Sequence, residues 1–281
     1  MREKLTGLGI LALAVALAWG VVAFVQARGG DWVVALIGTE RAGADAAMVE
    51  TLFNLMVFTP LVLIALGAAA AERRNAAALG RRRMALIGLV VGLAGLSICV
   101  LYARLAGSLS LGQAGGATAA MLIWGMALIA FQTAAEEVYF RGWLQPALVS
   151  RWGAAGGIAA AALAFAALHV AGGARAPVSL LNLVLGGLMF GLLAWRGGGV
   201  AGALGLHFAW NASEQLLYGV DPNPGVGGFG AVWDWELIGR PIWGGSEDGL
   251  NGSIGMTIVL LAILLPLALY RRPPPPEPLT R

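Results

Sequence analysis

A small set of polar residues, able to do acid–base chemistry, falls inside apolar stretches of this sequence. The set comprises Glu136, Glu137, Arg141, His169, His207 and Asn211. It includes both histidines of the protein. Even on insertion scales, an ionisable side chain at the centre of a bilayer costs about 2.5–3.5 kcal/mol. Each of these groups therefore needs a partner or a function, and their concentration in three apolar stretches favours a function.

Helical spacing separates the roles of the two glutamates. Glu137 and Arg141 are four residues apart with the acid first, which is the favourable order for an ion pair within a helix. Glu136 points about 100° away from this pair and is left without the cation. A carboxylate beside a second carboxylate suits general acid or base chemistry. We therefore predict a reactive Glu136 and a charge-paired Glu137.

The remaining members lie on two further helices. His207 and Asn211 are four residues apart, as are Phe165 and His169, so each pair shares one helix face. Two neutral side-chain donors on one face can stabilise a developing negative charge.

The depth of His169 follows from the expected hairpin. A helix that continues through residues 143–150, with a kink at Pro146, would turn at residues 151–153. Glu136 then lies 16 residues before Trp152, and His169 lies 17 residues after it. Antiparallel helices place equidistant residues at equal depth, so we expect Glu136 and His169 to meet.

The amino-acid composition indicates that these helices are surrounded by lipid. Of 281 residues, 59% are hydrophobic and 12% are charged, whereas about a quarter of the residues in a soluble domain are charged. Mean hydropathy is +0.79. The net charge of +3 is scattered without a long basic run, which argues against a nucleic-acid partner. Cys99 is the only cysteine, so no disulfide within the chain and no thiolate metal site is available.

Apolar run length predicts an all-α, polytopic transmembrane bundle of about eight helices. The runs are Leu5–Val25, Met48–Ala71, Met84–Ala103, Thr118–Ser150, Ala154–Ala171, Val178–Trp195, Val200–Leu217 and Ile254–Tyr270. With the N-terminus inside, 13 Lys and Arg residues fall on the cytoplasmic side and 5 on the other. The positive-inside rule therefore predicts that both termini are cytoplasmic.

The runs divide the chain into five parts. Residues 1–116 form an N-terminal scaffold of three spans, and residues 117–217 form a core of four spans that carries the polar set. An outer Gly- and Trp-rich loop, 218–253, leads to the last span, 254–270. Residues 271–281 form a Pro-rich cytoplasmic tail, expected to be extended.

Three motifs follow one another in the core as EExxxR (Glu136 to Arg141), FxxxH (Phe165 to His169) and HxxxN (His207 to Asn211). Their order and spacing resemble the CAAX protease and bacteriocin-processing (CPBP, or Abi) family of intramembrane endopeptidases, which includes the type II CAAX prenyl proteases. The resemblance implies that Glu136 activates water with help from His169, while His207 and Asn211 stabilise the oxyanion. Glu137, Arg141 and Phe165 would support this arrangement.

The resemblance leaves the cofactor open, since the family has been described both as metalloproteases and as glutamate-dependent proteases. Glu136, His169 and His207 could supply the three ligands of a catalytic zinc, but no HExxH motif is present. The prediction is metal-independent chemistry or weak zinc binding. Expected partners are the lipid bilayer and a membrane-embedded peptide or protein, either prenylated or a secreted-peptide precursor. The Ala-, Gly- and Arg-rich composition favours a bacterial cytoplasmic membrane.

Two other classes of function use the same residues. Buried Glu and His side chains also mark proton relays and transporters, although no internal repeat supports that class here. A non-catalytic immunity or scaffold protein could retain the motifs for structure alone. Glu50, an isolated acid in the second run, is interpreted as structural.

Overall fold

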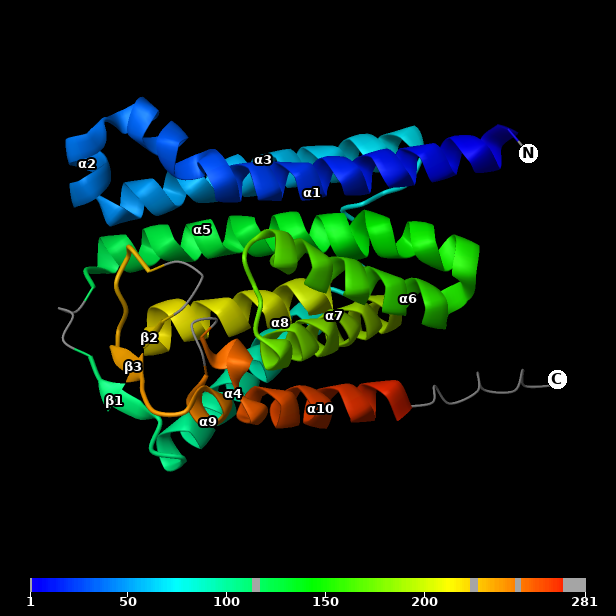
Figure 1. The fold of residues 1–281 in the computed structure, drawn as a ribbon. Helices are drawn as coiled ribbons and strands as arrows, with labels where there is room; N and C mark the ends of the chain where they lie inside the picture. The colour runs from blue at the N-terminus through cyan, green and yellow to red at the C-terminus, as the bar shows by residue number, and fades with distance from the viewer. Residues whose placement is uncertain (1, 113–116, 223–226, 246–248, 270–281) are drawn as a thin grey trace.

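The computed structural model describes residues 2–112, 117–222, 227–245 and 249–269, and most of them are helical (Figure 1). The α-helices are α1 (Arg2–Ile37), α2 (Thr39–Ala44), α3 (Ala46–Ala71), α4 (Arg83–Leu105), α5 (Ala119–Glu137), α6 (Gln145–Ala171), α7 (Pro177–Gly197), α8 (Ala201–Ala212), α9 (Pro241–Gly244) and α10 (Ile254–Leu269). Two π-helices, η1 (Val138–Leu144) and η2 (Ser213–Tyr218), directly follow α5 and α8, and η3 (Leu250–Gly252) is a short 3₁₀ turn.

The helical, multi-pass class of the protein is confirmed. Five helical stretches are long and apolar enough to cross a membrane: Gly7–Ile37, Ala46–Ala71, Arg83–Leu105, Ala119–Ala171 and Pro177–Gly197. The fourth stretch has 53 residues and contains two of the expected spans. The last two expected spans correspond to shorter helices, since α8 has 12 residues before η2 and α10 has 16. The total of eight crossings stays a prediction.

The long stretch contains the expected hairpin. Gly153 interrupts α6 with φ 74° and ψ 172°, a conformation that glycine adopts without steric cost, and the chain reverses there. The turn predicted at residues 151–153 is therefore confirmed. Pro146 follows directly after the π-helix η1 within one continuous helical stretch, so the helix is distorted next to this proline, and a kink at Pro146 itself stays a prediction.

The first and last helices place the two ends of the described chain at the same end of the bundle. The beginning of α1 and the end of α10 lie at the same end, together with the Gly153 turn (Figure 1). The connection from α3 to α4 contains Arg73, Arg74, Arg81 and Arg82, and belongs to this end too. This arrangement agrees with two termini on one side of a membrane, and the assignment of that side as cytoplasmic remains a prediction.

Glycines bring α4 and α8 into backbone contact. A Cβ atom added at Gly88 would lie 2.3 Å from the carbonyl oxygen of Gly202, and one at Gly205 would lie 2.3 Å from that of Ala85. Side chains larger than hydrogen are thus excluded from this interface, as in other close-packed membrane helices. The close approach fixes the position of α8, the helix that carries His207.

The outer segment contains more structure than a simple loop. Strand β3 (Trp235–Leu237) pairs antiparallel with β1 (Leu109–Leu111) and parallel with β2 (Val220–Asp221). The sequence analysis did not predict this small sheet. Parts of the expected outer loop and the whole Pro-rich tail, 271–281, lie outside the described residues.

Candidate active site

Glu137 and Arg141 form the expected ion pair at the junction of α5 and η1. The Arg141 guanidinium donates to Glu137 Oε1 at 3.0 Å, and both side chains are fully buried, with relative exposures of 1% and 0%. Arg141 also donates to the carbonyl oxygen of Gly187 at 3.2 Å. Its guanidinium carbon lies 4.7 Å from the centre of the Phe165 ring and 5.0 Å from that of Phe190. The cation is therefore enclosed by its counter-ion and by aromatic faces, which attract it.

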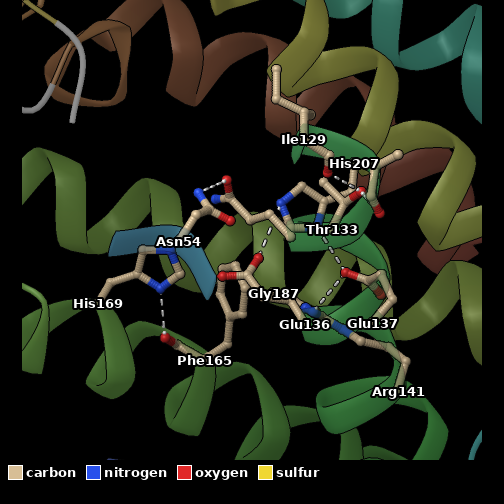
Figure 2. Close-up of polar contacts among 12 residues, drawn as sticks. Asn54, Ile129, Thr133, Glu136, Glu137, Arg141, Phe165, His169, Gly187 and His207 are labelled. Carbon is tan, nitrogen blue, oxygen red and sulfur yellow. Dashed lines mark hydrogen bonds and ion pairs between the residues drawn. The ribbon is translucent and has the colours of Figure 1, made fainter. Parts of the chain in front are cut away.

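His207 of α8 connects the two glutamates (Figure 2). Its Nδ1 lies 2.9 Å from Glu137 Oε1, and its Nε2 lies 3.4 Å from Glu136 Oε2. The imidazole stacks on Phe190, with 4.7 Å between ring centres and 22° between planes. Sequence reasoning missed both contacts of this ring, because spacing along one helix does not reveal partners on another.

The two contacts of His207 constrain its protonation. Both ring nitrogens face carboxylate oxygens, so either the ring is an imidazolium or one carboxyl group carries a proton. With Arg141 charged and both glutamates ionised, an imidazolium makes the buried charges sum to zero. Transfer of one proton from Nε2 to Glu136 leaves that sum unchanged. The arrangement can therefore exchange a proton between Glu136 and His207 without creating a net buried charge, which suits acid–base chemistry.

His169 lies near the end of α6 and is half-buried. Its Nδ1 is 2.9 Å from the carbonyl oxygen of Phe165, so Nδ1 carries the hydrogen and Nε2 is left as an acceptor. In the view of Figure 2, the Glu136 carboxylate lies between the rings of His169 and His207. No hydrogen bond or ion pair joins Glu136 to His169 among the described residues, so the structure does not show the predicted meeting as a direct contact.

Asn211 follows His207 by one turn of α8 and is half-buried. It makes no side-chain hydrogen bond in the described part of the chain. The shared helix face that the spacing predicts is therefore present, and the amide is free for a ligand.

Three further polar residues escaped the sequence analysis. Asn54 of α3 donates to Gln132 of α5 at 3.3 Å, and Glu214 of η2 is buried with 5% exposure. All three stand in apolar runs, so a search for every polar residue, rather than for ionisable pairs at helical spacing, would have found them.

The structure brings two of the three candidate zinc ligands together. In the described ranges, no group of three or more His, Cys, Asp or Glu side chains could hold an ion. Of the three zinc ligands that the sequence suggests, His207 and Glu136 face each other, with 3.4 Å between Nε2 and Oε2. No hydrogen bond or ion pair joins His169 to either of them among the described residues.

Fold and site together define a helical membrane protein with a buried, charge-balanced acid–base centre. Residues 118–213 match a family model described as type II CAAX prenyl endopeptidase Rce1-like, and this match supports assignment to the CAAX protease family. All seven residues of the three motifs lie within the match. No curated protein matches the chain. The resemblance to the CPBP family is thus confirmed, and it supports a protease.

Proposed function

We propose that the protein is an intramembrane endopeptidase that hydrolyses a peptide bond of a membrane-anchored substrate with a water molecule activated by Glu136. The continuous chain of contacts from Arg141 through Glu137 and His207 to Glu136 carries this proposal. Such a chain buries four ionisable groups in a helical membrane protein, which is costly unless the groups have a function.

The first step is attack by water on the scissile carbonyl. Glu136 takes one proton from the water as its oxygen bonds to the carbonyl carbon. His169 Nε2 accepts the second water hydrogen in a hydrogen bond, because Nδ1 holds the ring hydrogen against Phe165. With both hydrogens of the water held by Glu136 and His169, its lone pair is directed at the scissile carbonyl carbon. General-base catalysis requires this positioning.

The second step is collapse of the tetrahedral intermediate. His207 Nε2–H and the Asn211 amide, one turn apart on α8, donate to the oxyanion and stabilise its charge. Glu136 then gives its proton to the leaving nitrogen as the C–N bond breaks. The products are a carboxylic acid and an amine, and Glu136 returns to its ionised form.

The substrate class follows from the membrane setting and the family. A prenylated protein ending in a CAAX sequence is one candidate, and the precursor of a secreted peptide is the other. Both present a peptide held at the bilayer by an apolar group. We place the enzyme in a bacterial cytoplasmic membrane, with both termini in the cytoplasm.

Cleavage by the purified protein in lipid vesicles tests the proposal. A farnesylated CAAX peptide, the same peptide without the lipid and a secreted-peptide precursor are incubated with the protein, and mass spectrometry identifies the fragments. Wild type should cleave a membrane-anchored peptide, and Glu136→Ala and His169→Ala should lose that cleavage. Retained turnover in both variants would contradict the proposal.

Metal analysis tests the side-chain mechanism separately. The wild-type protein should keep its activity after chelation and dialysis. Stoichiometric, tightly bound zinc that is essential for cleavage would require a different site geometry from the one described.

A further inference from the structure

The side-chain oxygen of Asn54 is buried and has no hydrogen-bond partner in the described part of the protein. Asn54 belongs to α3, which lies outside the residues that match the family model. Its Nδ2 donates to Gln132 Oε1 at 3.3 Å. A buried acceptor without a donor costs about 1–3 kcal/mol. A donor from a bound molecule would therefore stabilise this oxygen.

Asn54 is hydrogen-bonded to the face of α5 that carries Glu136. Gln132 precedes Glu136 by one turn of α5, so the two side chains share a helix face and are about 6 Å apart along the axis. Helix α3 packs against both α5 and η1. In Figure 2 the Asn54 amide lies near the Glu136 carboxylate and the His169 ring, on the opposite side of the carboxylate from Arg141.

Glu136 and His169, the candidate catalytic groups, offer Asn54 acceptors rather than donors. An ionised Glu136 has no hydrogen to give, and His169 uses its Nδ1–H on the Phe165 carbonyl. A peptide substrate, in contrast, presents backbone N–H groups along its whole length.

We infer that Asn54 Oδ1 accepts a backbone N–H of the substrate peptide next to the scissile bond. Helix α3 then contributes a substrate-binding residue to a site whose other members all come from residues 118–213. Gln132 holds the amide in place, and the hydrogen bond sets the register of the peptide against Glu136. This inference rests on the proposed function, which supplies the peptide ligand.

Backbone N-methylation of the substrate tests the contact. Each peptide of a series carries one N-methyl group near the cleaved bond, which removes a single N–H. At one position, methylation should lower kcat/KM of the wild type about five- to tenfold, as expected for loss of one hydrogen bond. Asn54→Leu should lose about the same factor on the unmethylated peptide, and methylation at that position should then cost it less than twofold.

A matched control comes from the same helix. The Thr51 hydroxyl donates to the Ala47 carbonyl, one turn back along α3. Thr51→Val removes a polar group from α3 without touching the Asn54–Gln132 pair, so it should keep the wild-type sensitivity to methylation. Equal methylation effects in wild type and Asn54→Leu, with cleavage intact, would overturn the inference and leave the proposed function standing. A uniform fall in kcat without coupling to methylation would also overturn it, because that result assigns Asn54 to the water.

A labelling experiment gives a readout that needs no turnover and no Asn54→Leu protein. Asn54→Cys is placed in a Cys99→Ala, Glu136→Gln background, and the farnesylated peptide is added before a maleimide. The peptide should slow labelling of Asn54→Cys at least fivefold and leave labelling of Leu55→Cys, which is exposed on the outside of α3, unchanged. Protection without wild-type cleavage would contradict the proposed function alone. Labelling that the peptide does not change would contradict the inference.

Discussion

The chain buries carboxylates beside two π-helices, and their surroundings differ. Glu137, just before η1, accepts from Arg141 and contacts His207, so it lies between two cationic or potentially cationic groups. Glu214, within η2, is hydrogen-bonded by the backbone N–H of Leu250 in the turn before α10. No ion pair involves Glu214 among the described residues. One acid belongs to a chain of ionisable groups, and the other is bound to the backbone.

The different surroundings of Glu137 and Glu214 suggest a chemical role for the first and a structural role for the second. The turn that holds Glu214 is also fixed by Asn182 of α7, whose amide donates to the carbonyl oxygens of Asn251 and Ser253 at 2.7 and 3.0 Å. These contacts join η2, α7 and the start of α10, and each ends on a backbone group. The contacts of Glu137 instead lead through His207 to the buried Glu136. We therefore expect the cluster of Glu137, His207 and Glu136, rather than Glu214, to pass a proton toward a ligand.

Replacing Glu136 and replacing Glu214 should give the largest difference in activity between two variants. Glu136→Gln keeps the size of the side chain and removes the base, so kcat should fall about 1000-fold or more. Glu214→Gln can still accept the Leu250 N–H and should keep activity within about twofold. Peptide cleavage by the two purified variants measures both effects. Loss of activity in a folded Glu214→Gln protein would place Glu214 in the mechanism and abolish the distinction.

Removal of the buried cation should mainly affect stability. Arg141→Met leaves Glu137 buried beside aromatic rings without its counter-ion, which should cost about 3–5 kcal/mol of unfolding free energy. The double variant Arg141→Met, Glu137→Gln removes both charges and should recover more than half of that loss. Chemical unfolding in detergent measures all three proteins. Additive losses in the double variant would show that the two residues are not coupled.

Neutralising the acid that orients His207 should have an intermediate effect on activity. Glu137→Gln weakens the hold on Nδ1 while Glu136 stays in place, so kcat should fall about 100-fold with KM nearly unchanged. A variant that changes KM alone would indicate a role in substrate binding instead.

The sequence predicted contacts within one helix better than contacts between helices. The pairing of Glu137 with Arg141 and the hairpin at Gly153 were both readable, because each depends on spacing or on a local turn residue. The contacts of His207 with both glutamates were not, since they depend on how α8 packs against α4 and α5. The packing between these helices depends on glycines such as Gly88 and Gly205, and glycine, with 42 residues, is too common in this sequence to identify a partner. The three-stranded sheet was not predicted either, because its strands are two or three residues long and show no recognisable alternation of apolar and polar residues.

The smallest effect is expected for an acid outside the membrane-spanning segments. Burial raises the pKa of Asp221 above its ordinary value, and the nearby charges of Asp234 and Glu236 raise it further. Between the ordinary and the raised pKa, the folded state therefore holds more protons than the unfolded state. Stability should fall as the pH rises through this window and stay lower above it.

Asp221→Asn removes that dependence. Because the side chain is largely exposed to solvent and its charge is screened, the variant should gain only a few tenths of a kcal/mol at pH 7, or about 1 °C in Tm. Below the ordinary pKa of aspartate, about 3.9, the gain should vanish, because Asp221 is protonated in both states. Thermal unfolding of both proteins between these pH values measures the difference. A gain in stability that persists at low pH would arise from packing rather than from charge. The acids of the outer sheet would then carry no electrostatic cost, and the contrast with the charge-balanced cluster around Glu137 would be lost.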